Sequence, residues 1–206
     1  MRFSGTGSMS TPTFMLPGEL EMAGYQFLAS PTLYPGQLVR ARVKADRNMA
    51  AVIFITVYNA KGTTDRVYGK ASRLEAGEIR ELSFTVPETN GNPVAQVGVE
   101  ARAENDSSMQ LDFLSWDGAP NVVFHRPDPE GILPAKNRNI WRRAWIQGVD
   151  QWDGHWKEAF RLAQNTGRGL LIQGTREWTD YEAEATVRIS MAEAGGIAVR
   201  VQGMRR

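Results

Sequence analysis

Acidic side chains alternate along a segment late in the chain, in a spacing that carboxylate chemistry uses. Asp180, Glu182 and Glu184 are each separated by one residue. On one face of a β-strand such residues stand about 6.6–7 Å apart, which suits the acid and base of glycoside hydrolysis. One hypothesis is therefore a glycoside hydrolase that uses Glu182 and Glu184. We favour the opposing one, a solvated outer face whose acids balance Arg188, because this segment shows no aromatic lining for a groove.

Tryptophans form a second candidate site. All six lie at or after Trp116, and four of them fall between positions 141 and 156. Flat rings stack on the C–H faces of sugars, while polar neighbours bond to the hydroxyls. The predicted ligand-binding residues are Trp141, Trp152, Trp156, Arg142, Asp150, Asp153 and His155. The alternative is that the rings plug a small sandwich or seal an interface between the two halves. We favour a packing role over ligand binding for these rings, most of all for Trp145.

Metal and cofactor chemistry have little support in the composition. The chain has no cysteine and two histidines, His125 and His155, which excludes disulfides, thiolate zinc sites and cysteine nucleophiles. We expect no metal and no cofactor. An alternative is a structural calcium ion bound by Asp117, or by Asp150 with Asp153. The spacing of these residues matches no recognised calcium-binding loop.

The charge balance bears on possible partners. With 24 basic and 23 acidic residues the formal charge is +1, so we expect neither nucleic acid nor an anionic membrane as a partner. No stretch approaches the ~18–20 apolar residues of a membrane span. Residues 1–8 lack the apolar run of a secretory signal. The compartment stays open, with the cytoplasm slightly favoured.

The elements that must position these residues are short strands. Between positions 20 and 120, apolar and polar residues alternate with period two, and turn residues interrupt the pattern. The run 39–44 places small apolar side chains at its odd positions and basic ones at its even positions. Further runs at 51–58, 81–86, 93–102 and 109–116 complete an antiparallel sandwich pattern.

The second half has strand patterns of its own, at 144–147, 157–163, 170–173, 181–189 and 195–201. A short helix through Trp156, Phe160 and Ala163 is an alternative for one of them. About five strands in some 70 residues make a thin sandwich. The predicted divisions are a flexible arm over 1–19, a sandwich over 20–120, a proline-rich linker over 121–140, and a partial sandwich over 141–206.

Particular segments add a resemblance to known families. Segments 74–78, 84–87 and 111–120 resemble jelly-roll, galactose-binding-like modules that stand beside carbohydrate-active enzymes. Segments 174–181 and 195–200 are similar to the concanavalin-like sandwich family. In this order the two resemble the non-catalytic C-terminal region of certain bacterial ADP-ribosylglycohydrolase family proteins. The resemblance implies no catalytic residue here, because the acidic metal-binding motifs of the family's helical catalytic domain have no counterpart.

The sequence thus predicts an all-β protein of two antiparallel sandwich units, jelly-roll and concanavalin-like, the second incomplete and neither catalytic. The leading hypothesis is an accessory module that binds a glycan or sugar-containing ligand through exposed aromatic rings. The alternative is a structural module that positions a catalytic partner, or forms a homo-oligomer through the strand edge at 196–206.

Overall fold

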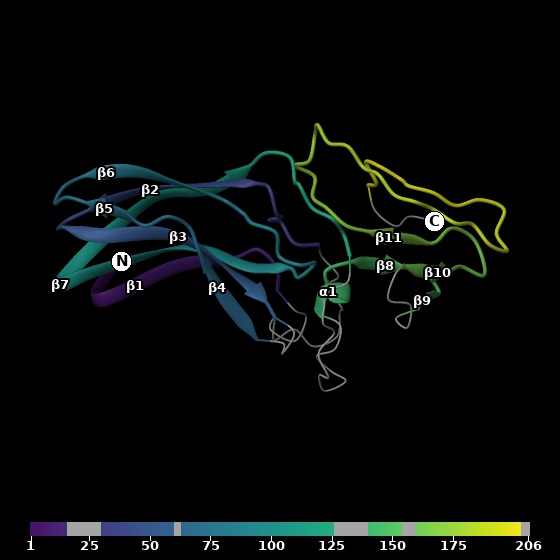
Figure 1. Cartoon of the computed structure of the whole chain (residues 1–206), viewed down its shortest axis with the longest axis horizontal. Helices are drawn as coiled ribbons and strands as arrows, with labels where there is room; N and C mark the ends of the chain where they lie inside the picture. Colours follow the sequence, from purple (N-terminus) through teal and green to yellow (C-terminus); the bar gives the residue numbers. More distant parts are fainter. Residues whose placement is uncertain (16–29, 60–62, 126–139, 154–159, 203–206) are drawn as a thin grey trace.

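The computed structural model describes residues 1–15, 30–59, 63–125, 140–153 and 160–202 (Figure 1). Strands make up 48% of the described residues and helix 2%, so the predicted all-β fold is confirmed. A large sheet assembly occupies one end of the molecule, and smaller ladders lie at the other (Figure 1). Among these residues no helix is both long and apolar enough to cross a membrane.

One layer of the large assembly is built around a central strand pair. Strand β3 (Met49–Tyr58) pairs with β7 (Val94–Asp117), and β7 pairs on its other side with β1 (Arg2–Pro12). Two short strands, β4 (Thr64–Tyr68) and β5 (Ser72–Leu74), follow each other along the free edge of β3. All of these pairings are antiparallel.

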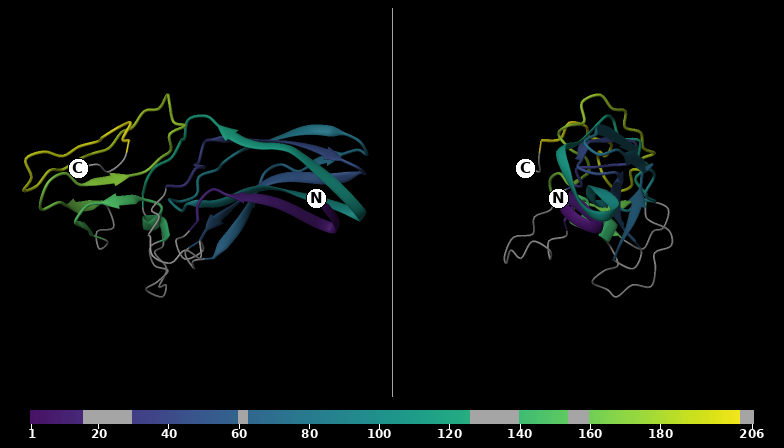
Figure 2. Two further views of the ribbon diagram at one scale, coloured as in Figure 1. Left: turned by 180° about the vertical axis from the view of Figure 1, so that it is seen from behind. Right: turned by 90° about the vertical axis from the view of Figure 1, so that its left-hand side faces the viewer.

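The second layer contains β2 (Leu38–Ala45) and β6 (Ile79–Thr85), and the last part of β7 completes it. The 24 residues of β7 serve both layers, because positions 94–102 pair with β3 and positions 109–117 pair with β2. Figure 2 shows this long strand curving from one layer into the other. The sandwich is therefore one antiparallel sheet folded over on itself.

The core lies between the layers and follows the predicted period of two. Odd-numbered residues of β2 and β3 point inward and are buried, and even-numbered residues point outward. The largest fully buried members of this core include Val39, Val43, Ile53, Ile55, Val97 and Val99. Full burial of such a side chain contributes about 1.5–3 kcal/mol, so the layers are held together chiefly by this face.

The N-terminal segment differs from the prediction of a flexible arm over 1–19. Residues Arg2–Pro12 form β1, which pairs along β7 as far as Ser108. Phe3 and Met9 pack against the core. A register shift between Phe3 and Gly5 breaks the alternation, and this irregularity hides the strand in the sequence. Positions 16–19 of the predicted arm lie outside the described residues.

The second half begins with a single helical turn, α1 (Ile140–Arg143), followed by four strands of three residues each. Strand β8 (Ile146–Gly148) pairs with β11 (Leu170–Ile172), and β9 (Gln151–Asp153) pairs with β10 (Arg161–Ala163), both antiparallel. Residues 161–163 form a strand and not the end of the alternative helix, whose positions 156–159 lie outside the described residues. Of the predicted linker, positions 121–125 have no regular structure and 126–139 lie outside the described residues.

Two predicted strands are absent from the described part of the second half. Residues 181–189 and 195–201 form no ladder. Their alternating apolar residues are about half exposed, at 50% for Val187, 49% for Ile189, 50% for Ile197 and 57% for Val199. Alternation specifies a face, but a strand also needs a hydrogen-bonded neighbour, and none is present among residues 173–202.

Candidate ligand-binding face

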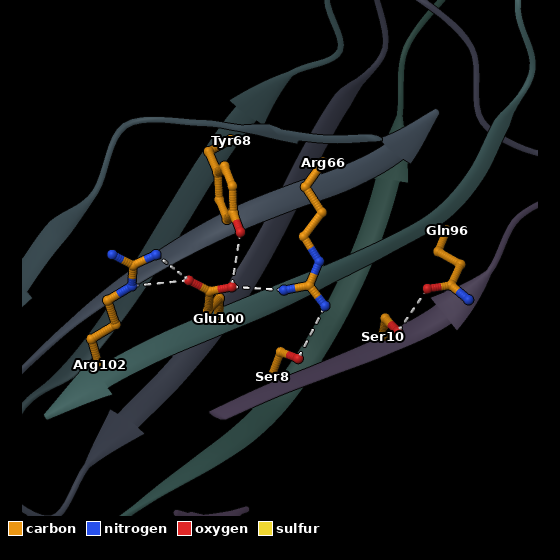
Figure 3. A network of polar contacts seen from close by, with 7 residues as sticks. All are labelled: Ser8, Ser10, Arg66, Tyr68, Gln96, Glu100 and Arg102. Carbon is orange, nitrogen blue, oxygen red and sulfur yellow. Dashed lines mark hydrogen bonds and ion pairs between the residues drawn. The ribbon is translucent and has the colours of Figure 1, made fainter. Parts of the chain in front are cut away.

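Polar side chains gather on the outer face of the first layer, opposite the core (Figure 3). Residues that face each other across antiparallel strands point to the same side of the sheet. The register of β4, β3, β7 and β1 therefore brings one set of side chains together on this face. The set drawn in Figure 3 is Ser8, Ser10, Arg66, Tyr68, Gln96, Glu100 and Arg102; we call it the Glu100 face.

Glu100 is the centre of this face, and its side chain is only 3% exposed. Its Oε2 accepts hydrogen bonds from Nη1 of Arg66 at 2.7 Å and from the hydroxyl of Tyr68 at 3.0 Å. Its Oε1 accepts two from Arg102, from Nε at 3.0 Å and from Nη2 at 2.9 Å. Four donors from three side chains thus converge on one carboxylate.

The surroundings of Glu100 favour its charged form. Burial alone would raise the pKa of this carboxyl, but the hydrogen bonds from Arg102 and Tyr68 and the positive charges of Arg102 and Arg66 outweigh it. The pKa of Glu100 therefore lies below its ordinary value. An ionised carboxylate with four bound donors is a poor general base, so it serves to hold the two guanidinium groups in place.

Phe54 supports this arrangement from beneath. It lies on the outer face and yet is fully buried, because the guanidinium carbon of Arg66 lies 4.3 Å from the centre of its ring. The ring of Tyr68 flanks it at 6.1 Å between centroids. Arg66 is thus fixed by an ion pair at one end and by a ring below it.

Accessible groups remain above this support. The side chains of Arg66 and Arg102 are 41% and 66% exposed, and Tyr68 is 42% exposed. Beside them, the hydroxyl of Ser10 donates to Oε1 of Gln96 at 3.2 Å. The face offers a phenol ring, hydroxyls, an amide and two guanidiniums in fixed positions, a combination that can form several hydrogen bonds to one ligand.

The predicted tryptophan platform has a different environment. Trp141 and Trp152 are each 5% exposed, and their rings meet edge to face at 5.4 Å. Trp145 and Phe160 complete a small aromatic core. Burial leaves little of either ring accessible, which fits the packing alternative, and a ligand-binding role for Trp141 and Trp152 stays a prediction.

The polar members of that predicted site lie around the aromatic core. Arg142 stacks over the ring of Trp152, 4.5 Å from its centre, and donates to the carbonyl oxygen of Trp152 at 2.7 Å. Asp150 is exposed and accepts from the backbone N–H of Asn165 at 2.8 Å. The Asp153 side chain, His155 and Trp156 lie outside the described residues. A ligand-binding role for the set as a whole stays a prediction.

The predicted carboxylate row lies in the segment without a ladder. Asp180, Glu182 and Glu184 are all exposed there, as the solvated-face hypothesis expects. Among the residues that the structure describes, no three His, Asp or Glu side chains gather closely enough to hold a metal ion.

A small cavity lies between the two halves of the molecule. Its volume is about 30 Å³, and its lining includes Tyr34, Phe124, Trp145 and Gln173. This volume holds about two water molecules and is too small for a sugar ring. An open sheet face is therefore a better candidate for ligand binding than this cavity.

Comparisons with known proteins found a distant neighbour among the solved structures. No family model matches the chain, and no curated protein matches it. A solved structure titled "Family 16 Carbohydrate Binding Module-2" is similar over 57% of this chain and 74% of that chain, with 13% identity and a TM-score of 0.31. These findings give no support to the resemblance to ADP-ribosylglycohydrolase family proteins, and such a distant likeness leaves function to be argued from the Glu100 face.

Proposed function

We propose that this chain is a non-catalytic binding module that recognises a glycan or sugar-containing ligand on the Glu100 face. The observation that carries the proposal is the saturation of one buried carboxylate by Arg66, Tyr68 and Arg102. It holds three partly exposed side chains in fixed positions on a solvent-facing sheet. Groups fixed in advance lose little conformational entropy when a ligand binds.

The chemistry of the face suits a polyhydroxylated ligand. Arginine and amide groups donate to sugar hydroxyls, serine hydroxyls both donate and accept, and the ring of Tyr68 offers an apolar edge for C–H groups. A flat face excludes little water, so modest affinity is expected. The proposed ligand class is the one that the sequence predicts. The proposed site is the Glu100 face of the sandwich, in place of the buried rings of Trp141 and Trp152.

Binding without catalysis also fits the carboxylates. Both oxygens of Glu100 are occupied by donors, so a substrate would have to displace an ion pair to use it as a base. Glu182 and Glu184 are exposed on a segment that forms no ladder, which supports a solvated role. The glycoside hydrolase hypothesis remains a proposal that ranks below binding.

A glycan array followed by calorimetry on the best hit tests the proposal. Gln96→Ala and Tyr68→Ala are expected to weaken binding at least fivefold. Gln110→Ala is the matched control, since Gln110 is exposed on the same strand, β7, but in the other layer. An array without hits would overturn the proposal, as would a hit that the three variants affect equally.

A second candidate function is an interaction module that positions a catalytic partner or forms a homo-oligomer. It is favoured by the four half-exposed apolar side chains at 187, 189, 197 and 199, since exposed apolar side chains can form contact surfaces. The sequence resemblance suggests an ADP-ribosylglycohydrolase-type catalytic domain as such a partner. A monomer in light scattering, at concentrations up to the millimolar range, would count against the homo-oligomer.

A further inference from the structure

We infer that the ligand of the Glu100 face is an anionic glycan, one that carries uronate carboxylates or sulfate esters. This inference rests on the proposed function and adds the ligand's charge to it. It is carried by a third arginine, Arg73, which the strand register places on the same face as Arg66 and Arg102.

The register defines the position of Arg73. Ala50 on β3 is opposite Arg73 on β5 on one side and opposite Arg102 on β7 on the other. Residues opposite each other across antiparallel strands share a face, and two strand spacings amount to about 10 Å. Two arginines therefore flank a position that carries only a methyl group.

The hydrogen bonds leave donors available at both arginines. Arg102 uses Nε and Nη2 on Glu100, and its Nη1 has no partner among the residues that the structure describes. The side chain of Arg73 is exposed and makes no hydrogen bond or ion pair within that same part of the chain. A ligand oxyanion between the two could accept from both.

Arginines outnumber acids among the paired residues of this face. Three guanidiniums, of Arg66, Arg73 and Arg102, face the single carboxylate of Glu100, while the whole chain carries only +1. Two further acids border this group, because Glu104 follows Arg102 and Glu75 follows Arg73, each two residues along the chain. Neither makes an ion pair with these arginines among the described residues, so the guanidinium donors that Glu100 does not use remain available for an anion.

The chemistry of the guanidinium narrows the ligand class. Its planar fork of N–H groups matches the oxygens of a carboxylate or sulfate. A neutral sugar would use the hydroxyl, amide and ring groups of the face but leave the donors of Arg73 and Arg102 without a charged acceptor. Carboxylate and sulfate share this recognition, so the experiment distinguishes them.

Calorimetry with two matched ligand pairs tests the inference. One pair is polygalacturonate and its fully methyl-esterified form, which differ in carboxylate charge; the other is dextran sulfate and dextran. We expect at least tenfold tighter binding of the charged member in one pair, and that pair identifies the anion. Raising the salt concentration from 0.05 to 0.5 M should reduce the difference, because exposed charges are screened.

Arginine variants test which residues produce the preference for a charged ligand. R73Q breaks no side-chain hydrogen bond or ion pair with the described residues and is expected to weaken binding of the charged ligand about threefold. R73Q/R102Q is expected to weaken it at least tenfold. R40Q/R42Q is the matched control, because it removes two positive charges from the outer face of the second layer. It should weaken binding less than twofold. Equal losses in the two double variants would overturn the inference.

The inference and the proposed function fail differently. In one outcome, the charged and neutral members of both pairs bind with equal affinity, and Gln96→Ala still abolishes binding of a neutral glycan. This outcome refutes the preference for an anionic ligand but leaves the Glu100 face as a glycan-binding site. No binding to any of the four polymers and no hit on the glycan array refutes both.

Discussion

The ring of Phe54 on β3 occupies the space in which a side chain at position 98 of β7 would stand. A Cβ atom at Gly98 would lie 2.9 Å from Cζ of Phe54 and 2.8 Å from Cβ of Ser10, and it would also meet the carbonyl oxygen of Met9. The glycine therefore lets Phe54 lie flat across the sheet under Arg66. The position of Arg66 therefore depends on the absence of a side chain at Gly98, on a neighbouring strand.

Gly98→Ala is expected to lower the free energy of unfolding by about 1–3 kcal/mol, because the added methyl group overpacks a site bounded by backbone and a ring. Urea denaturation measures the change. Gly196→Ala is the control, since a Cβ there meets no heavy atom within 4 Å, and we expect its effect to stay within about 0.5 kcal/mol. Equal effects at the two positions would contradict the packing described.

Glu100→Gln should cost about 1–3 kcal/mol at pH 7, because it removes a charged acceptor from a buried cluster. The pKa of Glu100 is lower in the folded state than the roughly 4.3 of an unfolded chain. Its contribution to stability is therefore complete above that unfolded value and is lost as the pH falls through the folded one.

The measurement for Glu100 is urea denaturation from pH 7 to pH 3. The difference between wild type and Glu100→Gln should narrow as the pH falls below about 4. Glu81→Gln, at an exposed acid on β6, should stay within about 0.5 kcal/mol of wild type at pH 7. A difference between wild type and Glu100→Gln that is constant from pH 7 to pH 3 would show that the carboxylate is not stabilised by its charge.

Trp152→Ala should destabilise the second half by about 3–5 kcal/mol, because a buried aromatic side chain leaves a cavity among its neighbours. Near-ultraviolet circular dichroism should report loss of the packed rings of Trp141, Trp145 and Phe160. Trp152→Phe keeps a ring there and should cost less. Ligand binding should persist in Trp152→Phe, and a loss of binding in this folded variant would return the site to the tryptophan cluster.

The sequence predicted the sandwich well where burial alone specifies it. In β2 and β3 the period of two separates a buried face from an exposed one, and tertiary packing agrees with the local pattern. The same rule was wrong for residues 181–189, where the alternation is equally regular. That segment has a patterned face but no ladder partner among the described residues, and a pattern within one segment cannot reveal whether a neighbour exists.

The Glu100 face could not be predicted, because its members come from strands far apart in the chain. Glu100 and Arg102 lie in a run that the alternation identified, but Ser8 belongs to a segment expected to be a flexible arm, and Arg66 belongs to a short strand with no clear pattern. A charged pair at the end of the alternating run 93–102 was the available signal. The tryptophan site was predicted from composition, which does not distinguish a buried ring from an exposed one.

The apolar side chains of residues 181–202 permit a last prediction. Ile189 and Val199 are 49% and 57% exposed, so Ile189→Ser and Val199→Ser remove about half of the surface that a core residue would bury. We expect each to lower the free energy of unfolding by less than about 1.5 kcal/mol. Ile53→Ser is the comparison, since Ile53 is 2% exposed in the core and should cost more than about 3 kcal/mol. A loss above about 2 kcal/mol at Ile189, accompanied by a change in mass by light scattering, would show that this segment is covered by a second copy of the chain in solution and would favour the interaction module.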